Sequence, residues 1–95
     1  MKRFERKHYY EALAHAADGE QALLVHSWHG PSKYACFDGT PEIGKLFDQD
    51  SARLVATARR LGVRRVKVDR DGQPGQHVDL VGGPLHRAKQ EATAS

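Results

Sequence analysis

The 95-residue chain is predicted to form a single α+β domain. Two segments carry apolar residues at helical spacing, several shorter segments are apolar or alternate with polar residues, and glycine and proline clusters separate them. This pattern predicts a two-layer sandwich in the order αββαββ, with a four-stranded, mostly antiparallel sheet and two main helices on one face. The domain is predicted to cover residues 1–84, followed by a C-terminal tail over residues 85–95.

The first third of the chain is predicted to form a helix and then a hairpin. Residues 4–17 place apolar side chains on one stripe, and Gly19 suits the helix end because glycine accepts the left-handed conformation. Residues 21–28 and 33–37 are short and rich in apolar side chains, which is typical of strands. The breaker sequence over residues 29–32 predicts that these two strands pair antiparallel.

Residues 38–50 are predicted to connect the two halves of the chain and to contain a single helical turn. Their threonine-proline pair resembles the start of a helix. The apolar side chains of Ile43, Leu46 and Phe47 are predicted to cover the core, because a chain this small uses most of its apolar area. An exposed apolar contact with a partner is the alternative interpretation of these three residues.

The second half of the chain is predicted to repeat the order of helix and hairpin. Residues 51–61 show helical spacing, and Gly62 is suited to end that helix. Residues 64–70 alternate between valines and basic side chains, and residues 76–82 alternate again, so both are predicted to be strands. The Gly-Gly-Pro sequence over residues 82–84 is expected to end the second hairpin.

Positive charge is concentrated in the second half of the chain. Residues 53–95 carry nine Lys/Arg and four Asp/Glu, whereas residues 1–52 carry six and eight, so the basic character is local. Clustered positive charge favours the binding of a polyanionic partner, whereas scattered charge mainly keeps a protein soluble. We therefore expect a small non-enzymatic module that binds nucleic acid or a nucleoprotein complex; a solvated surface without a ligand is the alternative. The predicted contact residues are Arg59, Arg60, Arg64, Arg65, Lys67 and Arg70.

A second hypothesis rests on histidine, cysteine and aspartate side chains, which are the usual ligands of zinc and similar metals. If the two predicted hairpins lie side by side, five such residues could meet and form the centre of a metal-dependent hydrolase or nuclease. These residues are His26, His29, Cys36, His77 and Asp79. No pair among them has the close spacing of a metal-binding motif. The sequence therefore assigns no catalytic residue and no cofactor, with zinc or another divalent metal as the alternative.

The charge contrast between the two halves also predicts protein contacts, either a homodimer or a regulatory interaction such as a phage factor acting on a host protein. The single cysteine excludes an internal disulfide and favours a reducing compartment. No apolar run approaches the roughly 20 residues of a membrane helix, and the N-terminal residues lack the apolar core of a signal peptide. A cytoplasmic location without membrane attachment is expected.

The sequence LVATARRLGV, followed by a short strand and then HVDL, resembles a small bacterial and phage domain family whose function is not assigned. Domains of that family have a helix ending in Leu-Gly-aliphatic, a strand, and a His-aromatic-Asp-aliphatic motif. The matching residues here are Leu61, Gly62, Val63, His77, Asp79 and Leu80, with Val78 in place of the aromatic. The resemblance implies a bacterial or phage origin and a functional role for His77 and Asp79.

Overall fold

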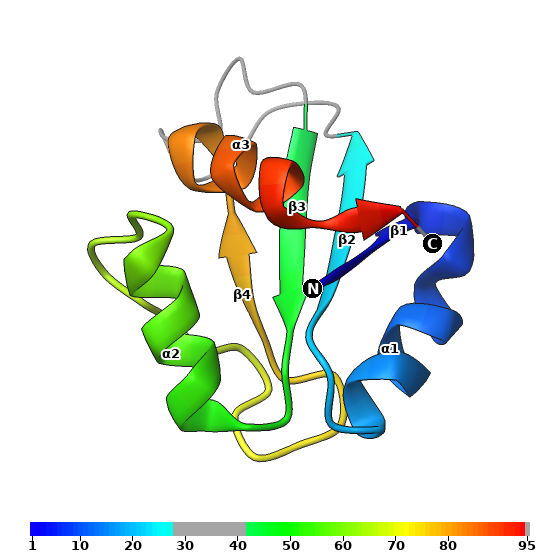
Figure 1. Cartoon of the computed structure of the whole chain (residues 1–95). Helices are drawn as coiled ribbons and strands as arrows, with labels where there is room; N and C mark the ends of the chain where they lie inside the picture. Colours follow the sequence, from blue (N-terminus) through cyan, green and yellow to red (C-terminus); the bar gives the residue numbers. More distant parts are fainter. Residues whose placement is uncertain (28–41, 95) are drawn as a thin grey trace.

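The computed structural model describes residues 1–27 and 42–94, which form an α+β fold around one mixed sheet (Figure 1). The α+β class is thus confirmed. The strands are β1 (Lys2–Glu5), β2 (Ala22–Ser27), β3 (Glu42–Phe47), β4 (His77–Leu80) and the two-residue β5 (Thr93–Ala94). The helices are the 3-10 turn η1 (Arg6–His8), α1 (Tyr9–Ala17), α2 (Ser51–Arg60) and α3 (Gly82–Glu91).

The sheet has the strand order β4-β3-β2-β1-β5. Strand β2 pairs antiparallel with β3, and β3 pairs antiparallel with β4, whereas β1 pairs parallel with both β2 and β5. Parallel neighbours need a crossover, and α1 supplies it between β1 and β2. The sheet is therefore mixed, and the predicted order αββαββ is wrong because a strand precedes α1.

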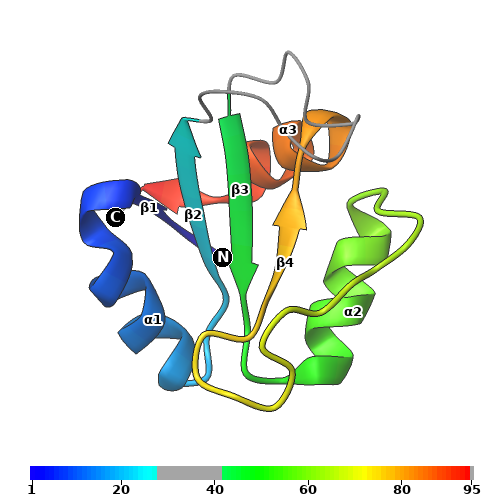
Figure 2. The same ribbon diagram turned by 180° about the vertical axis from the view of Figure 1, so that it is seen from behind.

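Helices cover both faces of the sheet, so the prediction of a single helical layer is also wrong. Helix α1 packs on one face, against Leu24 of β2 and Phe47 of β3. Helices α2 and α3 pack on the other face, against Leu23 and Val25. The reason lies in β2, where the consecutive side chains of residues 22–25 are all buried; a strand of that kind needs apolar neighbours on both sides. Figure 2 shows α1 and α2 on opposite sides of the strands.

The N-terminal segment starts as a strand, although a helix is predicted over residues 4–17. Phe4 is buried in β1, and Lys2 lies beside Ala22 in the parallel ladder with β2. The regular helix begins only at Tyr9. Its end is as predicted, since Gly19 has φ +93° and donates its N–H to a carbonyl of the last helical turn.

Residues 42–47 form β3, an interior strand of the sheet, and not a connection with a helical turn. Ile43, Leu46 and Phe47 are buried, so their predicted place in the core is confirmed. Both edges of β3 are paired, and these long-range bonds override the local signal for a turn. The predicted strand over residues 33–37 lies outside the described residues, and β2 pairs with β3.

Helix α2 agrees closely with its prediction, and the carboxylate of Asp50 caps it by accepting the N–H of Arg53 at 3.0 Å. In contrast, residues 64–70 do not form the predicted strand. Within this segment only Asp69 bridges to His77, at the edge of β4 that is not paired with β3. Val66 packs against the core formed by α2 and α3, which holds this segment near the sheet without a ladder.

The C-terminal residues, predicted to form a tail, include most of α3 and the short β5. The Gly-Gly-Pro sequence begins α3, since proline is tolerated in the first helical turn where an N–H is not needed. Leu85 and Ala88 of this helix are buried in the core, and the N–H of Thr93 donates to Met1 O at 3.0 Å. Among the described residues, no helix is both long and apolar enough to span a membrane.

Candidate metal centre

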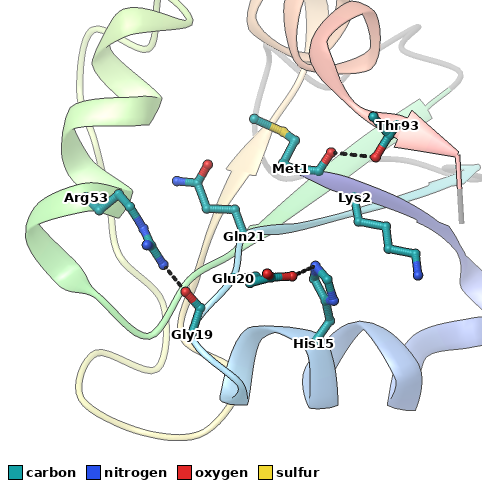
Figure 3. A pocket seen from close by; sticks show the side chains of 8 residues that line it. All are labelled: Met1, Lys2, His15, Gly19, Glu20, Gln21, Arg53 and Thr93. Carbon is teal, nitrogen blue, oxygen red and sulfur yellow. Dashed lines mark hydrogen bonds and ion pairs between the residues drawn. The ribbon is translucent and has the colours of Figure 1, made fainter.

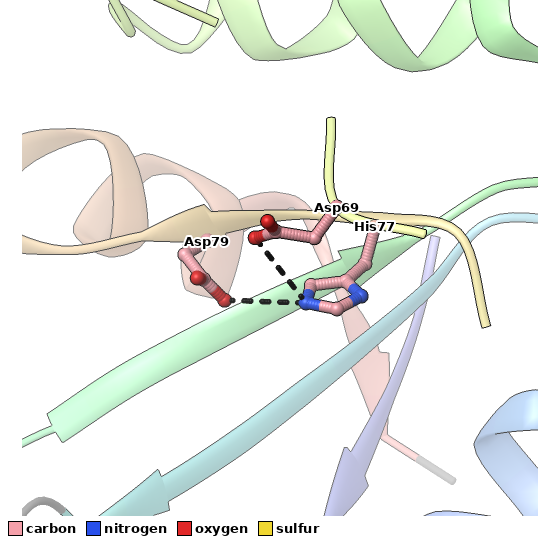
Figure 4. Close-up of side chains that lie close together, drawn as sticks. All are labelled: Asp69, His77 and Asp79. Atoms are coloured by element: carbon pink, nitrogen blue, oxygen red, sulfur yellow. Dashed lines mark ion pairs between the residues drawn. The ribbon is translucent and has the colours of Figure 1, made fainter. Parts of the chain in front are cut away.

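Two carboxylates and an imidazole converge at the edge of the sheet formed by β4 (Figure 4). His77 and Asp79 are two residues apart on β4, so their side chains project from the same face. Asp69 joins them because its backbone bridges to His77, with N–H to O distances of 2.8 and 3.0 Å in the two directions. One ligand atom from each of the three side chains lies within 4.8 Å of the other two.

The imidazole of His77 is held in one orientation. Its Nδ1 lies 2.7 Å from Gly75 O, and because a carbonyl can only accept, Nδ1 carries the proton. The ring packs against Phe47 with 5.3 Å between centroids, and 11% of the side chain is exposed. Nε2 therefore faces the two carboxylates. Histidine ligands of metals are oriented in this way, by a hydrogen bond from the second ring nitrogen to a backbone carbonyl.

The spacing of the ligand atoms matches a shared cation better than direct hydrogen bonds. Nε2 of His77 lies 3.7 Å from Asp69 Oδ2 and 3.6 Å from Asp79 Oδ1, longer than normal N–H to O distances. Two ligand atoms bound to one zinc ion at about 2.1 Å in tetrahedral geometry lie about 3.4 Å apart. In addition, Asp79 Oδ1 is buried and has no hydrogen-bond partner within the described residues.

The electrostatic environment of Asp79 also favours a cation. Burial raises the pKa of Asp79 above its ordinary value, and the neighbouring carboxylate of Asp69 raises it further. His77 and Lys45 act in the opposite direction and only partly compensate. A divalent cation between the carboxylates would offset both the burial and the repulsion.

A hydrogen-bonded loop supports the cluster. Residues 70–76 turn back from Asp69 to His77, and the buried amide of Gln76 anchors this turn to the N-terminal end of α2. Its Nε2 donates to Asp48 O at 2.8 Å, and its Oε1 accepts from Gly72 N at 2.8 Å and Ser51 Oγ at 3.1 Å. These bonds fix the loop next to Gly75, so the carbonyl oxygen of Gly75 lies within hydrogen-bond distance of His77 Nδ1.

The structure brings together two of the five residues that the sequence suggested as metal ligands, His77 and Asp79. His26 lies on β2, with Nδ1 at 3.2 Å from Ser27 O, and is not part of the cluster. His29 and Cys36 fall outside the described residues. Asp69 was missed, although the predicted hairpin over residues 64–82 contained the signal: closing it around the Asp-Gly-Gln-Pro-Gly turn sets Asp69 opposite His77.

Two of the six basic residues expected to bind nucleic acid form ion pairs with carboxylates of the chain. Arg60 Nη1 is 2.7 Å from Glu91 Oε2, and Lys67 Nζ is 3.8 Å from Asp69 Oδ1. The other four are exposed and form no ion pair within the described parts of the chain; they are Arg59, Arg64, Arg65 and Arg70. Sequence reasoning missed Arg87, whose Nη1 donates to Leu61 O at 3.0 Å and places a further cation at the end of α2.

A separate cavity of about 470 Å³ lies between β1, α1 and α2 (Figure 3). Apart from Lys2, its polar side chains already have partners within the described residues. Arg53 donates to Gly19 O at 2.7 Å, and His15 Nε2 is 3.1 Å from a carboxylate oxygen of Glu20. Such a paired lining leaves little to recognise a ligand, so the cluster on β4 remains the better candidate site.

Comparisons of this chain with protein-family models, with curated proteins and with solved structures give no significant match. The resemblance based on the Leu-Gly-Val and His-Val-Asp-Leu sequences therefore stays a prediction.

Proposed function

We propose that this protein is a metal-dependent hydrolase whose divalent cation is held by Asp69, His77 and Asp79. The observation that carries the proposal is the orientation of His77. Its Nδ1–H donates to Gly75 O, while its Nε2 faces two carboxylate oxygens. About a third of each aspartate side chain is exposed, at 32% and 35%, so solvent reaches the cluster. Three protein ligands leave a coordination position for water or substrate, as in catalytic zinc sites.

A cation at this position would supply a Lewis acid and lower the pKa of a bound water towards about 7. The protein's part is to present one neutral imidazole and two negative oxygens in fixed positions. A mixed nitrogen and oxygen set suits zinc or manganese better than calcium, which prefers oxygen ligands alone.

The competing interpretation is a structural ion pair, in which a doubly protonated His77 sits between the two aspartates. The distances of 3.6 and 3.7 Å speak against it, because such charge-assisted bonds are normally about 2.7–2.9 Å. The unpartnered Asp79 Oδ1 also speaks against it, since an imidazolium N–H would be expected to satisfy that oxygen.

Metal titration tests the proposal. Calorimetric titration with Zn²⁺ and Mn²⁺, and the visible absorption of Co²⁺, should give one ion per chain. The variant Asp79→Asn should weaken binding more than about 100-fold, because loss of an outer-shell partner alone costs 10–100-fold. The matched control is Asp71→Asn, an exposed aspartate in the same loop, which should bind as the native chain does. Equal affinity in the two variants, or no ion bound tighter than millimolar, would refute the metal centre.

Nucleic-acid binding by the exposed arginines is a second candidate function. Arg64 and Arg65 are exposed, and among the described residues neither has a carboxylate within ion-pair distance. In a fluorescence titration with a single-stranded oligonucleotide, R64S/R65S should reduce the salt slope by about 1.4, since each lost phosphate contact removes about 0.7. The control R6S/K7S removes equal charge from the exposed η1 turn. Binding that is equally weakened by both variants would indicate non-specific attraction only.

A further inference from the structure

Two lysine side chains lie beside the cluster. Lys45 on β3 is paired in register with Asp79 on β4, so both side chains project from the same face of the sheet. Lys45 is half-buried, and it lowers the pKa of Asp79 through its charge. It makes no ion pair within 4.0 Å in the described residues, which leaves its three N–H donors available.

Lys67 supplies the second ammonium group. Its side chain is 78% exposed, and Nζ lies 3.8 Å from Asp69 Oδ1, which is an ion-pair contact without a hydrogen bond. Lys67 and Asp69 are two residues apart in the segment that leads into the cluster. The two lysines thus flank the site from different directions, Lys45 from the sheet and Lys67 from the loop.

The charge balance of the site identifies its substrate class. A divalent cation would cancel the two carboxylates, and an imidazole that ligates a metal is neutral, so the ammonium groups of Lys45 and Lys67 would remain uncompensated. A neutral ester or amide would gain little from that excess, whereas the oxygens of a phosphate would gain charge-assisted hydrogen bonds. Resting on the metal-dependent hydrolase proposed above, we infer that the substrate is a phosphodiester and that Lys45 binds one of its non-bridging oxygens.

The surroundings of the cluster favour a diester within a chain over a small monoester. Strand β4 is the last in the sheet order, and the apolar cluster beneath α1 contains residues of β1, β2 and β3 but none of β4. Figure 2 shows α1 on the side of β1 and β2, away from β4. Exposed arginines lie on either side of Lys67 in sequence, at positions 64, 65 and 70, so further phosphates of one strand would find partners.

Hydrolysis at this site adds one water across one P–O ester bond. The water oxygen forms the new bond to phosphorus and gives up its proton to solvent. The ester bond to the leaving oxygen breaks, and that oxygen takes the electron pair. Lys45 takes no part in proton transfer in this step; its part is to bind the negative charge that the phosphoryl oxygens carry in the transition state.

The test compares a charged and a neutral ester with the zinc-loaded or manganese-loaded full chain. The probes are bis-p-nitrophenyl phosphate and p-nitrophenyl acetate, followed by their common product p-nitrophenolate. The variant Lys45→Met keeps the length of the side chain and removes its charge. It should lower kcat/KM for the diester about 10- to 100-fold while changing kcat/KM for the acetate less than about 3-fold. Lys45→Arg should recover part of the diester activity.

The control is Lys7→Met, which removes an exposed lysine in η1 and should change neither activity. Metal affinity of the Lys45→Met chain, measured by titration, should equal or exceed that of the native chain because a nearby positive charge is gone. Equal losses for both esters, or hydrolysis of the acetate alone by the native chain, would overturn the substrate inference and leave the hydrolase proposal standing. A chain that binds metal but cleaves neither ester would overturn both.

Discussion

Replacing Asp48 by asparagine tests how the candidate site is anchored to the body of the protein. Asp48 follows β3, and its side chain is fully buried. Its carboxylate accepts from Arg53 Nε at 2.7 Å, Arg53 Nη2 at 2.8 Å, Asp50 N at 2.9 Å and Gln21 Nε2 at 3.0 Å. Its backbone carbonyl accepts from Gln76 and so holds the loop that orients His77.

The expected cost follows from these contacts. An asparagine at position 48 keeps one acceptor oxygen but turns an N–H₂ group towards donors, so at least one charge-assisted bond to Arg53 is lost. Bonds to charged groups contribute about 1.5–3 kcal/mol each, while loss of a buried ion-pair partner costs about 3–5 kcal/mol. Because 43% of the Arg53 side chain is exposed and solvent can compensate it, we expect about 2–3 kcal/mol. For a domain of this size, that lowers Tm by roughly 8–24 °C.

The effect should depend on pH in a defined direction. Burial alone would raise the pKa of Asp48, but the hydrogen bonds from Arg53, Asp50 and Gln21 outweigh it and lower the pKa below the ordinary 3.8. A carboxylate with a lowered pKa in the folded state contributes stability above its unfolded pKa and loses it as the pH falls through the folded value. The stability difference between native chain and Asp48→Asn should therefore be full at pH 6–7 and shrink below about pH 4.

Urea denaturation followed by circular dichroism between pH 3 and 7 measures this difference. Asp71→Asn serves as the control, since Asp71 is exposed in the adjoining loop and should change the free energy of unfolding by less than about 0.5 kcal/mol. A difference for Asp48→Asn below about 0.5 kcal/mol at pH 7, or one that grows as the pH falls, would refute the assignment of Asp48 as a charged buried anchor.

Three further predictions concern the loop, the sheet and the cluster. Gln76→Ala removes three hydrogen bonds, so it should lower the unfolding free energy by about 2–3 kcal/mol and weaken metal binding; unchanged metal affinity would show that the loop does not position His77. Gly44→Ala should cost about 1–3 kcal/mol in urea denaturation, because its Cβ would lie 2.5 Å from Leu85 Cδ1; in a double-mutant cycle Leu85→Ala should cost less in the Gly44→Ala chain than in the native chain, and equal costs would contradict the contact. Since the pKa of Asp79 is raised in the folded state, the stability of the metal-free native chain relative to Asp79→Asn should fall as the pH rises above about 4; parallel pH profiles of Tm would contradict this.

The amino-acid sequence alone determined the elements whose signals are local. Residues 51–61 carry both a helical stripe and a cap, and α2 occupies almost the same range. Alternation along residues 76–82 predicted β4, and the same alternation put His77 and Asp79 on one face. Each of these signals lies within a few residues, so no knowledge of the rest of the chain is needed to interpret it.

The tertiary structure decided what depends on distant partners. Residues 42–47 become an interior strand only because β2 and β4 pair with them on either side. Lys2–Glu5 becomes a strand only because it pairs with β2 and β5. Asp69 reaches His77 through a single backbone bridge, and Lys45 reaches Asp79 through strand register. Backbone pairing between segments far apart in sequence has little local signature, because the hydrogen-bonding groups are the same at every residue. For that reason the sequence analysis identified two members of the cluster, His77 and Asp79, and the fold added the third member, Asp69, and the neighbouring Lys45.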